Sequence, residues 1–295
     1  DPFDDVGIKH RNIETATATA ADGDGRYEFV EGSVTDKDLV QKLVRGVEYI
    51  FHQAAQAGVQ ASVQNPKKTT DTNVLGTLTM LEAARDADIE RFVNASSSSV
   101  YGIPEYLPYD EAHPTTPVSP YAASKLSAEH YAQVYDEVYN LPSVSLRYFT
   151  VYGPRMRPNM AFTNFVSRCI HGESPVIYGD GNQTRDFTYV DDIVDANRRV
   201  LGTDAADGAV LNIGSTDRIT IDELARVIRD EVDPSVKIEY DDSRDGDAEH
   251  THADVSKANE LLGYTPSVSI KEGVRRFVEW YRANEEWYDP LVRRS

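Results

Sequence analysis

Strand-like apolar runs and helix-like stretches alternate along the first half of the chain. Strands are predicted at residues 27–30, 47–52, 91–95 and 143–148, and the run at 47–52 reads as a buried strand ending in small residues. Helices are predicted at residues 36–45, capped by Thr35 or Asp36, at 70–85 and at 121–139. This alternation predicts an α/β fold with a doubly wound parallel sheet, whose ligands bind at the carboxyl ends of the strands.

The second half of the chain has shorter elements and more proline, glycine and arginine. Helices are predicted at 161–171, 190–201, 221–231, 256–262 and 270–284, and strands at 176–178, 210–213 and 236–240. We expect a smaller C-terminal α/β lobe lying over the sheet. The expected division is a Rossmann-like domain at 1–153 and a lobe at 154–295, with residues of about 185–214 returning to the first domain. The charged segment 241–247 is expected to be a solvated loop.

The chain of 295 residues is strongly acidic, with a formal net charge of −19. An acidic surface repels nucleic-acid phosphates and anionic membranes, so we expect neither as a partner. No apolar run approaches the ~18 residues that a membrane span requires. Dense carboxylates also keep a protein soluble when salt screens its charges, which leads to the hypothesis of a halophilic source.

The chain contains a single cysteine, Cys169, which excludes an internal disulfide and suits a reducing cytoplasm. Its apolar neighbours at 165–170 favour a core position over a role as a nucleophile. We therefore predict a cytoplasmic protein, and we predict no metal site.

Tyr121 and Lys125 stand one helical turn apart and therefore share a helix face. A phenol with a pKa near ~10 is a poor base at neutral pH, but a nearby ammonium favours the phenolate and lowers that pKa. A solvated helix face is the alternative reading of this spacing. The serine run at 96–99 follows a predicted strand, and its hydroxyls complete a candidate site for proton transfer on a hydroxyl-bearing substrate.

Seven motifs in order accompany this pair. They are HQAA at 52–55, NVLGT at 73–77, SSSSVYG at 96–102, SPYAASK at 119–125, LRYFTVYGP at 146–154, GDGNQTRDF at 179–187 and RDGD at 244–247. In combination they resemble the extended short-chain dehydrogenase/reductase family, which comprises nucleotide-sugar epimerases and dehydratases. The resemblance runs from about residue 29 to the C-terminus and implies NAD as cofactor.

The resemblance implies a role for each matched residue. Tyr121 is implied to be the catalytic base, Lys125 its partner at the nicotinamide ribose, and Ser97 a hydrogen-bonding partner of the substrate hydroxyl. The implied cofactor-binding residues are Ser33, Val34, Gln53, Ala54, Ala55, Asn73, Tyr121, Lys125 and Tyr148. The implied substrate-binding residues are Ser98, Ser99, Thr150, Arg185 and Arg244.

Two of these assignments have alternatives. Asn73 is implied either to bind near the cofactor or to orient its helix. Arg185 and Arg244 are implied to hold the substrate diphosphate, because a planar guanidinium suits phosphate. Surface ion pairs with the many carboxylates are the other interpretation of these arginines.

The serine run also separates the chemistries within the family. A 4,6-dehydratase of this family carries an Asp-Glu pair where Ser98 and Ser99 stand, so 4-epimerisation of a UDP-sugar through a 4-keto intermediate is the favoured reading, with UDP-glucose and UDP-galactose as the substrates. Thr150 and the run at 153–161 resemble the uronate epimerases, which keeps UDP-glucuronate as an alternative. Thr251 is small, so an N-acetylated sugar also stays open.

Two expectations concern the start of the fold and its assembly. No Gly-x-x-Gly-x-x-Gly occurs in the sequence, so we expect an N-terminally truncated Rossmann-like domain that lacks the first βαβ unit. A non-catalytic nucleotide-sugar-binding protein is the alternative function if the glycine-rich loop is truly absent. The resemblance further implies a homodimer formed by the helices at 70–85 and 121–139, although Leu75, Leu78 and Leu81 suit core packing equally well.

Overall fold

The larger sheet of the protein is parallel and supplies the frame for the site. The computed structural model describes residues 6–23, 25–242 and 250–294. The strand order is β1-β2-β3-β7, formed by β1 Tyr49–His52, β2 Arg91–Ser97, β3 Ser143–Tyr148 and β7 Val210–Ile213. In this register Ser96 lies opposite Arg147, and Arg147 lies opposite Asn212. Side chains alternate between the two faces of a strand, so these three point to the same face.

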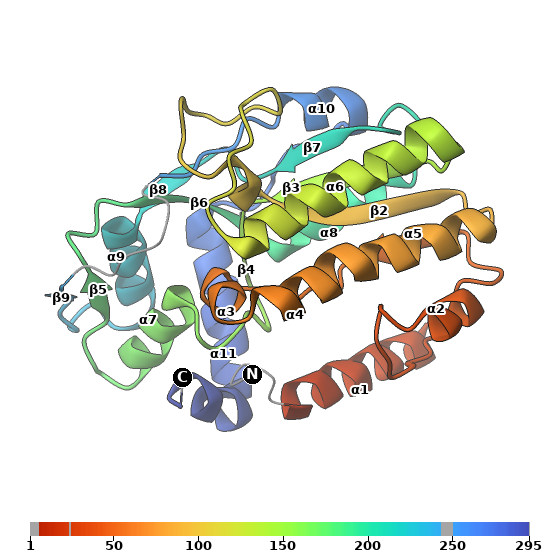
Figure 1. The fold of residues 1–295 in the computed structure, drawn as a ribbon. Helices are drawn as coiled ribbons and strands as arrows, with labels where there is room; N and C mark the ends of the chain where they lie inside the picture. The colour runs from red at the N-terminus through yellow and green to blue at the C-terminus, as the bar shows by residue number, and fades with distance from the viewer. Residues whose placement is uncertain (1–5, 24, 243–249, 295) are drawn as a thin grey trace.

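Helices cover both faces of this sheet, as the doubly wound prediction requires. Figure 1 shows α5 and α6 on the near side and α8 on the far side. The bounds are α2 Lys37–Leu43, α3 Val59–Gln64, α4 Pro66–Thr70, α5 Gly76–Asp86, α6 Pro120–Tyr139, α8 Val190–Val200 and α10 Ser256–Leu262. One apolar core lies between the sheet, α8 and α10, and another between the sheet, α2 and α5. The predicted α/β fold is therefore confirmed.

The start of α6 follows from its first residues. Ser119 is the N-cap, and its hydroxyl accepts the backbone N–H of Ala122 at 3.1 Å. Pro120 occupies the first turn, where its missing N–H costs nothing. Tyr121 is therefore held in the first helical turn, at the carboxyl edge of the sheet.

The helix predicted at 70–85 is interrupted by a wider turn. A π-helical segment, Asp71–Leu75, joins α4 to α5. Such turns are rare, and they occur frequently at functional sites. Asn73 lies in this segment with a buried side chain, which contacts the loop that follows β1.

The C-terminal lobe has its own core and two smaller sheets. Their strand orders are β4-β6-β8 and β5-β9. The bounds are β4 Thr150–Tyr152, β5 Val176–Tyr178, β6 Thr184–Tyr189, β8 Arg218–Thr220, β9 Glu239–Asp241, α7 Ala161–Ile170, α9 Ile221–Val232 and α11 Ile270–Val292. Cys169 is buried in this core, and burial raises the pKa of its thiol to about 11. The predicted core position of this cysteine is confirmed.

Some predicted elements differ from the structure. Residues 27–30 form no strand, and Tyr27 and Phe29 are exposed there. A helix that was not predicted, α1 Val6–Asp22, begins the described part of the chain. The strands β4, β6 and β8 were not predicted, and β4 and β8 are only three residues long. None of the described helices is long and apolar enough to cross a membrane.

Candidate active site

The three predicted catalytic residues meet where β2 ends and α6 begins. Ser97 is the last residue of β2, and its hydroxyl is 3.1 Å from that of Ser99. Ser97 also forms a side-chain hydrogen bond with the phenol of Tyr121. Lys125 is buried, and its Nζ donates to the carbonyl oxygen of Ala95 at 2.6 Å. The fold thus places a hydroxyl, a phenol and an ammonium at one edge of the sheet.

Burial controls the ionisation of this group. Burial raises the pKa of Tyr121, and the hydrogen bond from Ser97 and the charge of Arg157 oppose that rise. Burial lowers the pKa of Lys125 to about 8. The sequence predicted that Lys125 would lower the pKa of Tyr121, and that prediction is wrong for the described residues. The physical reason is that the ammonium is desolvated and turned to a backbone carbonyl.

Arg157 is a functional candidate that sequence reasoning did not single out. It lies in the loop between β4 and α7, and its guanidinium is near Gly58, in the loop that follows β1. Its positive charge favours the phenolate of Tyr121. Only the resemblance of the run at 153–161 to uronate epimerases could have pointed to it.

Asn73 orients the surrounding chain. Its Oδ1 accepts the backbone N–H of Gln56 at 2.7 Å, and its Nδ2 donates to the carbonyl of Gln56 at 3.2 Å and to the hydroxyl of Ser124 at 2.9 Å. Ser124 immediately precedes Lys125. Of the two roles considered for Asn73, these contacts favour orientation of the loop and of α6.

His52 is a second residue that received no predicted role. Its Nε2 is 2.9 Å from the hydroxyl of Thr77, which itself donates to the carbonyl of Asn73 at 2.6 Å. Since that hydroxyl already donates its proton, we assign the ring proton to Nε2. Burial and the charge of Lys125 lower the pKa of His52 to about 4. His52 is therefore neutral beside the ammonium.

The predicted cofactor residues Gln53 and Tyr148 lie together. The Nε2 of Gln53 donates to the phenol of Tyr148 at 3.1 Å, and that phenol donates to the side chain of Asn197 at 3.0 Å. Asn197 lies on α8 and belongs to none of the sequence motifs, so the sequence offered no signal for it. Ala54 is exposed and Ala55 half-buried in the loop that follows β1.

Ser33 and Val34 lie in the turn that leads into α2. The hydroxyl of Ser33 is 2.8 Å from that of Thr35, and its carbonyl accepts the N–H of Asp36 at 3.0 Å. Val34 packs against the start of α5, where a β-carbon at Gly76 would stand 2.7 Å from its side chain. These contacts shape the turn, and the cofactor role of both residues stays a prediction.

The predicted substrate residues come from both lobes. Ser98 and Ser99 are half-buried in a short 3-10 helix, Ser98–Tyr101. Thr150 lies in β4 opposite Phe187, and Arg185 in β6 donates to the carbonyl of Thr184 at 3.0 Å. Arg244 lies outside the described residues. Within the described ranges, no group of three or more His, Cys, Asp or Glu side chains could hold a metal ion.

Comparison with known proteins identifies the family. Residues 5–277 match the family described as GDP-mannose 4,6 dehydratase. A UDP-glucuronate 4-epimerase of Thermodesulfobacterium geofontis is 36% identical over 267 residues, which cover 88% of this chain and 81% of that protein.

Two solved structures are also similar. The UDP-glucose 4-epimerase of Thermotoga maritima with UDP-glucose has a TM-score of 0.84 at 34% identity, covering 87% of this chain and 85% of that one. The UDP-glucuronic acid 4-epimerase of Bacillus cereus, in complex with UDP-glucuronic acid and NAD, has a TM-score of 0.84 at 33% identity, covering 92% and 87%. The chain therefore belongs to the nucleotide-sugar epimerases and dehydratases of the extended short-chain dehydrogenase/reductase family.

Proposed function

We propose that this protein is an NAD-dependent 4-epimerase of a UDP-sugar, which acts through a 4-keto intermediate. The observation that carries the proposal is the meeting of Ser97, Tyr121 and Lys125 at the carboxyl edge of the sheet. A phenol hydrogen-bonded to a serine hydroxyl suits proton transfer at a sugar hydroxyl. The matched family and the named 4-epimerases among its relatives support the same reaction class.

The residues at this edge fit a dinucleotide. An ammonium has three N–H donors, and among the described residues Lys125 uses one for Ala95, which leaves donors for the hydroxyls of a ribose. The small side chains of Ala54 and Ala55 permit close approach, and Tyr148 and Gln53 supply polar groups beside them. NAD⁺ bound here would supply the hydride acceptor and donor of the reaction. We assign its pyrophosphate contacts to no residue of this chain.

The chain's own groups handle the proton. Tyr121 takes the proton of the sugar 4-hydroxyl and returns it after the sugar has turned over, while Ser97 holds the substrate oxygen. Arg157 assists, because its charge favours the phenolate. We propose that Arg185 and Arg244 hold the diphosphate.

The family name includes dehydratases, but the side chains here favour epimerisation. Elimination of water requires a carboxyl acid and base, and the corresponding positions carry Ser98 and Ser99, which are hydroxyls. We therefore propose hydride-mediated epimerisation without loss of water. UDP-glucose and UDP-galactose are the first substrates to assay.

UDP-glucuronate is the second candidate substrate, and one observation favours it. The charge of Arg157 favours the phenolate of Tyr121, and we propose that the same charge would attract the carboxylate of a sugar bound there. The hydroxyls of Ser98, Ser99 and Thr150 supply further donors. Parallel assays with UDP-glucose, UDP-glucuronate and UDP-N-acetylglucosamine decide among the sugars.

The test of the reaction is Tyr121→Phe, which keeps the ring and removes the proton carrier. We expect turnover to fall by roughly 100-fold or more, while a UDP-sugar still binds in calorimetry. Retained turnover would overturn the proposal. UDP-sugar binding without turnover by the parent protein, with NAD supplied, would instead favour the non-catalytic binding protein.

We also propose a homodimer. Leu81 is fully buried in the core and Leu78 half-buried, whereas Leu75 is 50% exposed, so only part of the predicted leucine face serves internal packing. On α6, however, Tyr131, Val134 and Val138 form an exposed apolar stripe at helical spacing. Light scattering of the parent and of Val134→Glu/Val138→Glu tests this, with a shift from dimer to monomer as the expected result.

Two further proposals concern the setting of the protein. We propose that the net charge of −19 adapts the protein to high salt, so its unfolding temperature should rise between low and molar KCl. A cytoplasmic location stays a prediction.

We further propose that residues 1–153, with about 185–214, form the cofactor half of the enzyme. The supporting observation is that α8 and β7, which lie in the segment 185–214, join the larger sheet and its core.

A further inference from the structure

A buried polar layer lies between α6 and the larger sheet. Along β2, β3 and β7, five of the side chains on the face toward α6 are polar and at most 4% exposed. These residues are Asn94, Ser96, Ser145, Arg147 and Asn212. Such a layer is unusual in a protein core, because burying polar groups is unfavourable unless each finds a partner.

At the centre of the layer is a buried ion pair. Arg147 on β3 donates through Nη2 and Nε to the two carboxylate oxygens of Glu129 on α6, at 2.5 and 3.0 Å. Burial by itself would lower the pKa of Arg147, but the hydrogen bonds and charge of Glu129, with Tyr101, outweigh burial and raise it. The guanidinium therefore stays charged, and the two-point contact fixes its orientation.

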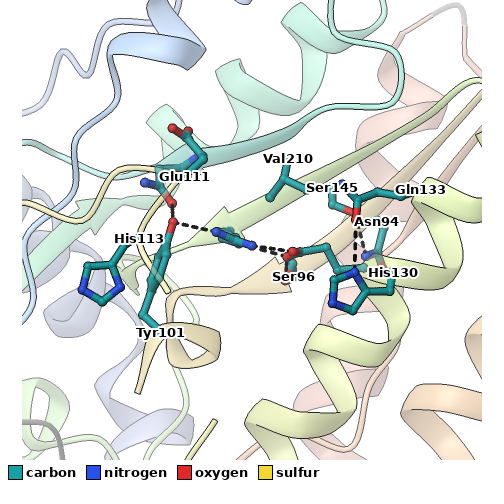
Figure 2. Close-up of polar contacts among 12 residues, drawn as sticks. Asn94, Ser96, Tyr101, Glu111, His113, His130, Gln133, Ser145 and Val210 are labelled. Carbon is teal, nitrogen blue, oxygen red and sulfur yellow. Dashed lines mark hydrogen bonds and ion pairs between the residues drawn. The ribbon is translucent and has the colours of Figure 1, made fainter. Parts of the chain in front are cut away.

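The ion pair makes two further hydrogen bonds, which we call its two arms. They join it to Ser96 and to Tyr101, which lie on either side of the hydroxyls at 97–99. The hydroxyl of Ser96 donates to Glu129 at 2.9 Å. Arg147 donates to the phenol of Tyr101 at 2.8 Å, and that phenol donates to Asn212 at 2.6 Å. Figure 2 shows these contacts as a continuous chain from Ser96 to Tyr101 and beyond it toward Glu111.

The positions of the two arms relate the network to the site. Ser96 immediately precedes Ser97, and Tyr101 ends the short helix that carries Ser98 and Ser99. On the other side, Glu129 follows Lys125 by one helical turn and Tyr121 by two. One ion pair therefore connects the serine segment to the helix that carries the phenol and the ammonium.

We propose that Glu129 and Arg147 are positioning residues, which hold Ser97 in register with Tyr121 and Lys125. Hydrogen bonds are directional, so a two-point contact prevents α6 from shifting along β2 and β3. Apolar packing alone would not prevent such a shift. Neither residue touches the reacting atoms. The proposal deepens the proposed function, on which it rests for the identity of the reaction.

The first experiment compares Glu129→Gln with a matched control. Glu129→Gln keeps the size of the side chain and removes the charge and one acceptor. We expect kcat to fall by roughly 100-fold, the loss that a misplacement of about 1 Å produces, with KM for the UDP-sugar within about twofold of the parent. The control is Asp207→Asn, which weakens another buried arginine pair, that of Arg91 at the start of β2. We expect its kcat to be unchanged.

The second experiment measures Tyr121 without using the reaction. The ultraviolet absorbance of each variant is titrated in pH jumps against the same variant carrying Tyr121→Phe, and the difference reports the ionisation of Tyr121. Glu129→Gln should raise the Tyr121 pKa further, by about one unit, because the hydrogen bond from Ser97 is lost. Asp207→Asn should leave the titration unchanged.

The outcomes separate the two proposals. A Glu129→Gln variant with the kcat and Tyr121 titration of the parent overturns the positioning role, even if its unfolding temperature is lower. A parent protein that turns over no UDP-sugar overturns the proposed function, while the titration still tests positioning. If Glu129→Gln does not fold, Ser96→Ala and Tyr101→Phe keep the ion pair and remove one arm each, and parent behaviour in both overturns the proposal.

Discussion

The two faces of one sheet differ in chemistry. On the face that α6 covers, β2, β3 and β7 present a buried polar layer centred on Arg147. On the face that α8 covers, most of the intervening residues of the same strands are apolar, and five of them belong to the core that includes α8. These residues are Val93, Val144, Leu146, Leu211 and Ile213, and all of them are fully buried.

The difference shows what each kind of contact supplies. Apolar burial is non-directional and provides most of the free energy of folding. A buried ion pair adds little net stability, but it restricts the geometry of the elements that it joins. The catalytic candidates are Ser97 at the end of β2 and Tyr121 and Lys125 on α6. The polar layer therefore lies between the two elements whose relative position sets the geometry of the site. Four predictions test this division between stability and geometry.

The largest effect is expected when the polar layer loses one charge. Glu129→Leu leaves Arg147 buried without its partner, and we expect the free energy of unfolding to fall by about 3–5 kcal/mol in urea titrations. Adding Arg147→Met removes the unpaired charge and should restore most of the loss. The double variant should still turn over slowly, because the register of α6 is not restored. A single variant as stable as its parent would contradict this prediction.

The apolar face should respond in the opposite way. Leu146→Ala removes a fully buried side chain of β3 on the α8 side, and we expect a loss of about 2–5 kcal/mol in the same urea titration. Because the polar layer is intact, kcat at a temperature where the variant is folded should stay close to that of the parent. A kcat as low as that of the Glu129 variants would show that geometry does not depend on the polar face alone.

The regular parts of this comparison were predictable from the sequence. Strand β3, the helix that begins near Tyr121 and the motif that pairs Tyr121 with Lys125 are local patterns, and local patterns carry the periodicity that predicts them. Residues 27–30 show the limit of this reasoning. They have strand-forming side chains, but a strand needs a partner, and the structure leaves Tyr27 and Phe29 exposed.

The contacts that set the geometry were not predictable. Glu129 and Arg147 are 18 residues apart on different elements, and no local sequence pattern indicates that they form an ion pair. The same holds for Arg157, whose charge acts on Tyr121 from the loop between β4 and α7, and for Asn197 on α8, which accepts a hydrogen bond from Tyr148. Asn73 illustrates a further limit, because a helical pattern does not distinguish a π turn from an α turn.

His52 extends the polar layer to the edge strand, since it pairs in register with Asn94 of β2. Its pKa is lowered to about 4 by burial and by the charge of Lys125, against an ordinary value of 6.5. Between pH 4 and pH 6.5 the imidazole of His52 is therefore protonated more readily in the unfolded chain than in the folded protein. Stability from this group is fully present above pH 6.5 and is lost as the pH falls toward 4, by on the order of 2–3 kcal/mol.

Urea titrations at several pH values check the acid effect of His52. The glutamine of His52→Gln does not titrate, yet its amide can still donate to Thr77. The free energy of unfolding should therefore fall less between pH 6.5 and 4 than it does in the parent, by the contribution of His52. An identical pH dependence in the variant and the parent would assign the acid loss to the carboxylates instead.

The smallest effect compares two buried tyrosines. Tyr101 is satisfied by Arg147 and Asn212, whereas the hydroxyl of Tyr152, in the core of the C-terminal lobe, has no hydrogen-bond partner among the described residues. A buried hydroxyl without a partner carries its desolvation cost uncompensated, so Tyr152→Phe should raise the free energy of unfolding by about 1 kcal/mol. Tyr101→Phe should lower it by a similar amount, because it leaves a guanidinium donor and an amide oxygen unpaired. Thermal unfolding of both variants provides the measurement. If both variants changed the free energy of unfolding in the same direction, the hydrogen bonds of the tyrosine hydroxyl would not explain the difference between the polar layer and the lobe core.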